Sequence, residues 1–199
     1  MTKRPPAQIT SGSIGYWAEL MTARGHASIF ARNSVEDKRV VERATVMEWV
    51  DAISVLEDVQ VDAVAPGPDN AFPDFTARLN GEPVSIELTE LLHSKNILKL
   101  AAKRQPSFEG VQWTEHRFRE RIRELLDAKA GKLSRSRRLC DVLIIHSDEP
   151  WLTPQKIEEW LAGGRFDKRP EIAAVYLLIT YVPGWAEHWP LFRIYGPLE

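Results

Sequence analysis

Two carboxylates flank a stretch with the pattern of a β-hairpin. Asp74 opens a run of alternating apolar and polar residues, Glu87 lies within a second such run, and Asn80-Gly81 separates the two. Asn-Gly between alternating runs is the strongest short-range signal for a two-residue type I′ turn. Counting outward from that turn places Asp74 directly opposite Glu87.

Alternation along the two runs also predicts their faces. The core face carries Phe75, Ala77, Leu79, Val84, Ile86 and Leu88, and the polar face carries Asp74, Thr76, Arg78, Ser85, Glu87 and Thr89. Opposed carboxylates repel unless a proton or cation lies between them, so removing either acid is expected not to lower the stability. A hard cation such as Mg²⁺ or Mn²⁺ would fit between Asp74 and Glu87. The alternative is an exposed hairpin whose acids merely face water.

The segment Pro73-Asp74…Glu87-Leu88-Thr89, with twelve residues between the acids, resembles the PD-(D/E)XK (restriction-endonuclease-like) nuclease superfamily. The resemblance implies that Asp74 and Glu87 bind the metal. In the family, a lysine two residues after the second acid helps to position or activate the attacking water, and here Thr89 occupies that position. Members also commonly carry a glutamate on the helix before the hairpin.

A helix is predicted from Ser34, its N-cap, to about Leu56, with an apolar stripe of Val46, Trp49, Val50 and Ile53. Continuing this stripe back by one turn reaches Glu42, which should point along the buried face. The resemblance implies that this acid assists the site through water or metal. The alternative is that Glu42 points toward solvent.

A second helix is predicted from about Thr114 to Leu133, with a stripe of Phe118, Ile122, Leu125 and Leu126. Lys129 falls on the same face. We therefore predict that its ammonium replaces the one missing at Thr89 and lies near Glu87, because an unpaired buried ammonium is costly. The alternative is that Lys129 snorkels, with its head in water.

Charge is unevenly distributed along the 199-residue chain, whose net charge is −2. Positions 91–138 contain 13 Lys/Arg and 5 Asp/Glu. A localised basic surface is consistent with phosphate binding, so we predict a nucleic-acid partner, DNA, contacted by Lys95, Lys99, Arg119, Arg123 and Lys132. A solvated helix face would show the same composition.

The remaining chain indicates one domain. Residues 1–33 are expected to form a partly ordered N-terminal extension that packs on the domain or on a second subunit, as in a homodimer, and residues 34–199 a nuclease-like α/β domain. Residues 59–72 contain a loop, Pro66-Gly67-Pro68-Asp69-Asn70, that leads into the hairpin, and residues 91–110 are expected to form a loop over the site. Strands are expected at 140–146, 171–182 and 191–195, and a helix after Thr153. The order of elements predicts an α/β fold with a mixed β-sheet and helices on both faces. This is also the restriction-endonuclease-like architecture that the resemblance implies.

Several functional classes find no support in the sequence. Gly-rich nucleotide-binding motifs and the Gly-x-Ser-x-Gly elbow do not occur. The single cysteine, Cys140, opens an apolar run and is expected to be a buried structural thiol. No apolar run is long enough to span a bilayer, so we expect a cytoplasmic protein with no membrane partner.

These observations predict a Mg²⁺- or Mn²⁺-dependent endonuclease that hydrolyses DNA phosphodiester bonds. The alternative keeps the fold without catalysis: an inactive nuclease-fold binding or regulatory protein of a defence or mobile-element system. Thr89 favours the alternative, and the pairing of Asp74 with Glu87 favours the enzyme.

Overall fold

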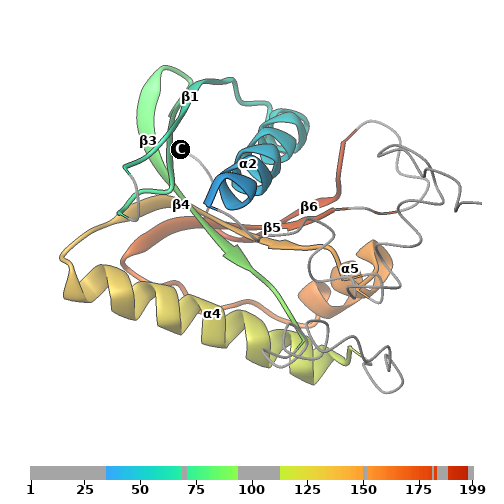
Figure 1. Ribbon diagram of the computed structural model, residues 1–199. Helices are drawn as coiled ribbons and strands as arrows, with labels where there is room; N and C mark the ends of the chain where they lie inside the picture. Colours follow the sequence, from blue (N-terminus) through green and yellow to red (C-terminus); the bar gives the residue numbers. More distant parts are fainter. Residues whose placement is uncertain are drawn as a thin grey trace, which may run out of the picture.

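The computed structural model describes residues 35–68, 71–93, 113–149, 152–180, 182 and 188–196 (Figure 1). The described helices are α2 (Val35–Glu57), α4 (Glu115–Arg135) and α5 (Pro154–Ala162). The described strands are β1 (Val61–Pro66), β2 (Phe75–Leu79), β3 (Glu82–Glu90), β4 (Cys140–Ser147), β5 (Ile172–Ile179) and β6 (Leu191–Tyr195).

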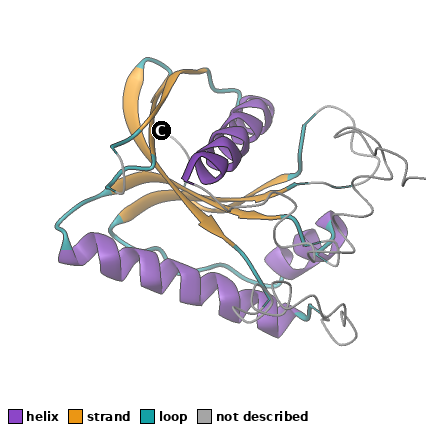
Figure 2. Ribbon diagram, viewed as in Figure 1, coloured by secondary structure: helices purple, strands orange, loops and turns teal. Residues whose placement is uncertain are grey.

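The six strands form one open, mixed sheet in sequence order, β1-β2-β3-β4-β5-β6. β2 runs antiparallel to both of its neighbours, β1 and β3; β3, β4 and β5 are parallel, and β6 returns antiparallel to β5. Helix α2 lies on one face of the sheet, and α4 and α5 lie on the other (Figure 2). The predicted α/β class, with a mixed sheet and helices on both faces, is confirmed at this level.

The hairpin of β2 and β3 has the predicted register. Asn80 and Gly81 both have positive φ, 50° and 89°, as a type I′ turn requires. Leu79 pairs with Glu82 at the turn, and the ladder continues to Phe75 opposite Ile86. The expected core-facing residues of β2 are buried, as are Ile86 and Leu88 of β3. The local turn chemistry therefore sets which residues of β3 face α4.

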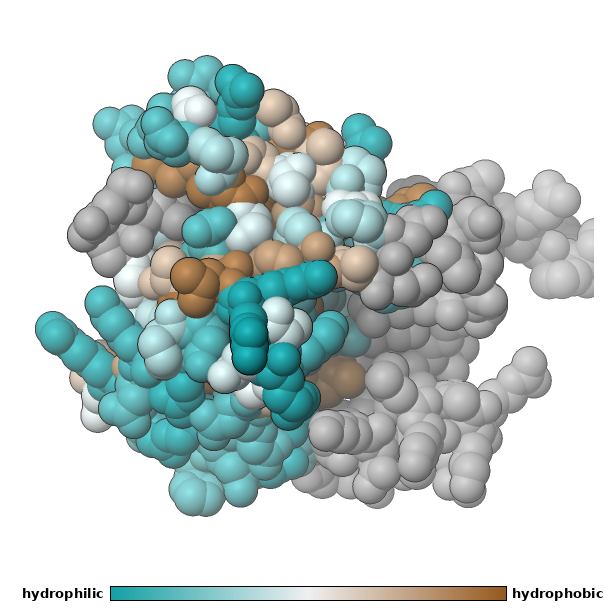
Figure 3. Space-filling model, turned by 90° about the vertical axis from the view of Figure 1, so that its left-hand side faces the viewer, coloured by the Kyte–Doolittle hydropathy of each residue, from teal (hydrophilic) through white to brown (hydrophobic). Residues whose placement is uncertain are grey.

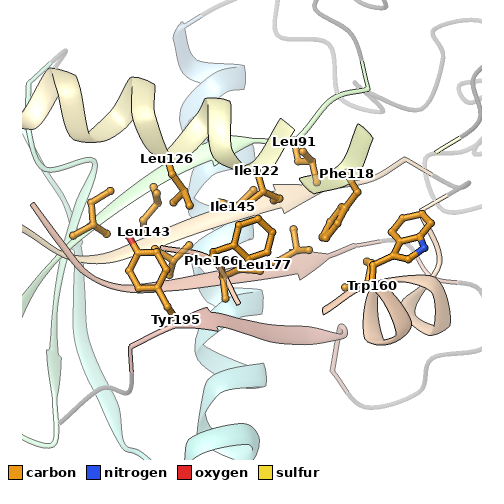
Figure 4. Close-up of a cluster of buried hydrophobic side chains, with 14 of the residues drawn as sticks. Leu91, Phe118, Ile122, Leu126, Leu143, Ile145, Trp160, Phe166, Leu177 and Tyr195 are labelled. Carbon is orange, nitrogen blue, oxygen red and sulfur yellow. The ribbon is translucent and has the colours of Figure 1, made fainter. Parts of the chain in front are cut away.

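Both faces of the sheet carry an apolar core. Under α4 and α5, the side chains of Phe118, Ile122, Leu126 and Trp160 pack on alternate residues of β4 and β5, including Leu143 and Leu177 (Figure 4). On the opposite face, α2 buries Val46, Trp49 and Ile53 against Ile86, Leu88 and the other set of alternate residues. Burial on both faces explains the nearly continuous apolar character of β4 and β5.

One element was not predicted: residues 61–66 form strand β1, ahead of the hairpin. β1 pairs antiparallel with β2, with an irregularity between Asp62 and Ala65, where Ala63 has φ of 53°. Most of its side chains are exposed, so it lacks the alternation that reveals a strand in sequence. Backbone pairing with β2 forms this edge strand.

Other expectations fall outside the described residues. They concern the 1–33 extension, the cap at Ser34 and most of the 91–110 loop, including Lys95 and Lys99. Within the described residues, no helix has both the length and the apolar character needed to cross a bilayer.

Candidate active site

Asp74 is bound to β3 by its side chain and to Gly67, the residue after β1, by its backbone. It directly precedes β2, one residue beyond the last residue paired with β3. Its Oδ2 accepts a hydrogen bond from the backbone N–H of Leu88, with N···O of 2.8 Å. Its backbone carbonyl accepts a bond from the N–H of Gly67, at 2.9 Å. The Asp74 carboxylate therefore lies beside the residue that follows Glu87.

Glu87 is a buried acid on the face of β3 that α4 covers. Lys129 of α4 donates a hydrogen bond to Oε2 of Glu87 and a second one, of 3.1 Å, to the carbonyl of Leu88. Only 13% of the Lys129 side chain is exposed, so it does not snorkel. The predicted position of the ammonium, near Glu87, is confirmed.

Helical periodicity places Lys129 at this point. Ile122, Leu126 and Leu133 of α4 are fully or almost fully buried against the sheet, and Lys129 lies on the same side of the helix. Its stem therefore follows the apolar stripe inward, and the ammonium ends at the one buried carboxylate that β3 presents there.

The pairing changes the physical basis of one expectation. Removal of an acid was expected not to lower the stability, because two opposed carboxylates repel. In the structure, the Glu87 carboxylate is neutralised by the Lys129 ammonium and the Asp74 carboxylate accepts an N–H. Removal of Glu87 would therefore leave the Lys129 ammonium without its partner, and removal of Asp74 would do the same to the N–H of Leu88.

The oxygen atoms around Leu88 are ligands of the kind that a hard cation prefers. Carboxylate oxygens of Asp74 and Glu87 and the Leu88 carbonyl are all oxygen ligands, and Mg²⁺ is usually held by one or two carboxylates with water completing its shell. The Lys129 ammonium already shows that the Glu87 carboxylate and the Leu88 carbonyl bind one cation together. No group of three or more His, Cys, Asp or Glu side chains in the described part of the chain could hold a metal ion. The candidate ligands at Leu88 are two carboxylates and one carbonyl.

Glu42 does not join this cluster in any described contact. It lies on α2, which covers the opposite face of the sheet from α4, and its carboxylate forms an ion pair with Lys38 at 3.3 Å. The side chain is partly buried, as the stripe predicted, but the described contacts leave it with a role in its own helix.

Of the predicted nucleic-acid ligands on α4, Arg119 bonds within the fold. Arg119 bonds to Glu115 at 2.8 Å and to the carbonyls of Trp160 and Gly164, and only 11% of its side chain is exposed. Its guanidinium links α4 to the end of α5, so we do not retain it as a nucleic-acid ligand. Arg123 is exposed and lies over the Phe166 ring at 6.0 Å, and Lys132 is exposed.

Cys140 has the structural role expected of it. The thiol is buried, and burial raises its pKa to about 12, with a further increase from the Glu87 carboxylate. A thiol with this pKa is a poor nucleophile.

Glu149 is a buried acid whose role the sequence did not indicate. It follows β4 and accepts hydrogen bonds from the backbone N–H of His93, at 2.6 Å, and from the indole N–H of Trp113. Burial raises the pKa of Glu149, and the two hydrogen bonds oppose that rise. Glu149 thus connects the end of β4 to residues on both sides of the 94–112 segment. Only its position after an apolar strand marked it in the sequence.

Glu149→Gln is expected to destabilise the protein by about 1–3 kcal/mol, because an amide cannot accept at both positions and leaves a buried donor unpaired. The deficit should shrink as the pH rises above 4.5, the ordinary value for glutamate. Because the pKa of Glu149 is raised in the folded protein, ionisation of this acid lowers the free energy of unfolding. The contribution of Glu149 to stability is therefore fully present below pH 4.5 and is lost as the pH rises through the folded-state pKa. Gln does not titrate, so the variant lacks this dependence. Urea unfolding at several pH values measures both. A deficit that does not change with pH would contradict the shift.

Gly67→Ala is expected to weaken the site without touching its side chains. A Cβ at Gly67 would lie 1.8 Å from the Pro73 carbonyl oxygen, so the chain leading to Asp74 must move. The expected result is weaker Mg²⁺ binding, measured as a smaller rise of the melting temperature with Mg²⁺. Gly131→Ala is the control, because its nearest contact is at 3.6 Å. Equal Mg²⁺ stabilisation in both variants would show that the position of Asp74 is immaterial.

Comparison with known proteins gave no match to a family model, to a curated protein or to a solved structure.

Proposed function

We propose that this protein is a Mg²⁺-dependent nuclease that hydrolyses DNA phosphodiester bonds, with a site of the PD-(D/E)XK type. The observation that carries the proposal is the meeting of Asp74 and Lys129 at the backbone of Leu88, next to Glu87. Two acids and one ammonium, supplied by three different elements, form a compact set of groups that phosphodiester hydrolysis uses.

The proposed roles follow from the charges. Asp74 and Glu87 would hold Mg²⁺, which polarises the phosphate and lowers the pKa of water. The N–H of Leu88 orients the Asp74 carboxylate, and burial orients that of Glu87. Lys129 would take the place of the motif lysine: its ammonium would orient the attacking water and stabilise negative charge that develops on the phosphate.

The arrangement of elements supports the restriction-endonuclease-like assignment. The hairpin carries both acids, a helix precedes it and another follows it, and the sheet is mixed with helices on both faces. This is the architecture that the resemblance implies. The departure is Thr89, and Lys129 offers a group of the missing chemical type from α4.

A binding or regulatory protein of the same fold is the second candidate. Lys129 is already bonded to both Glu87 and the Leu88 carbonyl, so the buried acid is neutralised by the protein itself. A site that is electrically satisfied in this way can persist for stability alone.

The two candidates differ in one assay. Wild-type protein and Asp74→Asn, purified in parallel, are incubated with plasmid and linear duplex DNA in Mg²⁺, in Mn²⁺ and in EDTA. A nuclease cleaves with Mg²⁺ or Mn²⁺, is silent in EDTA and loses activity in Asp74→Asn. DNA binding with no cleavage under any of these conditions would favour the regulatory candidate.

A further inference from the structure

Besides Arg123 and Lys129, the basic residues of α4 and of the turn that follows it form two groups with different surroundings. In the first half of α4, Arg117, Arg119 and Arg121 each pair with a glutamate of the same helix. Each also donates to a backbone carbonyl elsewhere in the fold, as Arg121 does to Leu92 at 3.0 Å. These three arginines therefore form their bonds within the fold.

The second group lies at the end of α4 and in the turn that follows: Lys132, Arg135, Arg137 and Arg138, all exposed. Positions 128–140 contain no acid. None of these four cations forms an ion pair with another described residue. Hydrophilic side chains cover the lower half of the face on which α4 ends (Figure 3). We call these four residues the basic end of α4.

The basic end of α4 adjoins the candidate active site on two sides. Lys132 follows Lys129 by three residues, slightly less than one helical turn. Arg138 lies over the ring of Phe72, with 5.4 Å from its guanidinium carbon to the ring centroid, and Phe72 precedes Asp74 by two residues. An anion bound at these cations would therefore lie in the part of the fold that holds Lys129 and the chain leading to Asp74.

Arg137 has an unfavourable backbone conformation. Its φ is 52°. The N–H of Arg137 donates to the carbonyl of Ser134 and the N–H of Arg138 donates to the carbonyl of Leu133, both at 3.0 Å. This pattern is a Schellman motif, in which the residue at this position is usually glycine. Favourable interaction of cations with a helix C-terminus accounts for Lys132 and Arg135. It does not account for an arginine at a position where glycine is less strained.

We propose that the basic end of α4 binds the phosphate backbone of duplex DNA and places a strand next to Asp74, Glu87 and Lys129. The inference rests on the proposed function, which supplies the reason for a strand at that site. Four cations that form no ion pair with a described residue, with no acid between them in the sequence, suit the repeated charges of a nucleic-acid backbone. Of the four, Arg138 also donates to the Phe72 carbonyl, at 3.5 Å. Anionic lipid is the competing partner, because Leu139 beside these cations is exposed.

The decisive single variant is Arg137→Gly. It removes one cation and relieves the left-handed conformation, so the melting temperature should rise while DNA affinity falls. The slope of log K against log salt, from fluorescence anisotropy with a labelled duplex, should fall by about 0.9. A purely structural Arg137 would give a rise in melting temperature with unchanged DNA binding, and that result would overturn its role.

The triple variant Lys132→Ala/Arg135→Ala/Arg137→Gly tests the surface as a whole. Its salt slope should fall by about 2 to 3, and its affinity at 0.1 M salt should fall on the order of 100-fold. The control, Lys38→Ala/Arg39→Ala/Arg43→Ala, makes the same change of net charge on α2 and should keep most of the affinity. Binding is measured in EDTA and in Ca²⁺, and vesicles with and without anionic lipid are included.

The outcomes separate this inference from the proposed function. Equal losses in the two triple variants, binding to anionic vesicles but not to DNA, or no DNA binding by wild type would each overturn the inference. Loss of the salt slope in the α4 variant alone supports it, whether or not wild type cleaves. Cleavage of the same DNA by the same preparations tests the nuclease independently.

Discussion

Lys129→Met is expected to lower the free energy of unfolding by about 3 kcal/mol, because the variant leaves the buried Glu87 carboxylate without its cation. Methionine keeps most of the apolar stem, so the packing of α4 on the sheet should be preserved. The Leu88 carbonyl loses a donor as well. Urea unfolding at neutral pH, followed by circular dichroism, measures the loss.

Lys132→Met is the matched control for this measurement. It is on the same helix and exposed, and its side chain makes no ion pair with a described residue, so its effect should be within about 0.5 kcal/mol. The double variant Glu87→Gln/Lys129→Met should lose less stability than the two single variants added together, because it removes both charges. Equal effects of Lys129→Met and Lys132→Met would mean that the pair with Glu87 contributes nothing.

Asp74→Asn and Glu87→Gln are each expected to abolish Mg²⁺-dependent cleavage and the stabilisation by Mg²⁺. For wild type, binding to the folded state alone adds about 2.7 kcal/mol at a Mg²⁺ concentration of 100 Kd. The amides keep the size of the acids and can still accept a hydrogen bond, so the fold should survive while the charge that binds the cation is lost. Thermal unfolding with and without Mg²⁺, beside a cleavage assay, measures both.

Glu82→Gln is the control for these two variants. Glu82 lies in the same hairpin, next to the turn, and is exposed. Its removal changes the net charge equally but should leave cleavage and Mg²⁺ stabilisation intact. If Mg²⁺ stabilises all four proteins to the same extent, the ion binds elsewhere and the proposed site is wrong.

Local rules determined the hairpin and the direction of Lys129. The Asn80-Gly81 turn sets the strand register within a few residues, and the alternation of side chains then sets the face on which Glu87 lies. The 3.6-residue period of α4 directs Lys129 toward the sheet in the same way. Both depend on residues close together in the sequence, so they could be predicted without knowledge of the rest of the fold.

The edge strand and the buried arginines were not readable in this way. β1 has little side-chain burial of its own and forms because β2 offers unpaired backbone groups beside it. Arg119 belongs to a basic stretch in the sequence, yet in the fold it bonds to carbonyls at the end of α5, some forty residues away along the chain. Composition reports charge but not what each charge contacts.

The candidate site also combines features that local sequence predicts with features that only tertiary packing sets. The sequence alone predicted that the two acids belong to one hairpin and that an inward lysine on a later helix lies near Glu87. Only the tertiary structure decided that Lys129 also bonds to the Leu88 carbonyl, that Asp74 bonds to the N–H of Leu88, and that Glu42 stays with Lys38 on the other side of the sheet. The reason is physical: secondary structure sets the direction of a side chain within its element, whereas its partner depends on how the parallel crossover from β3 through α4 to β4 packs that helix on the sheet.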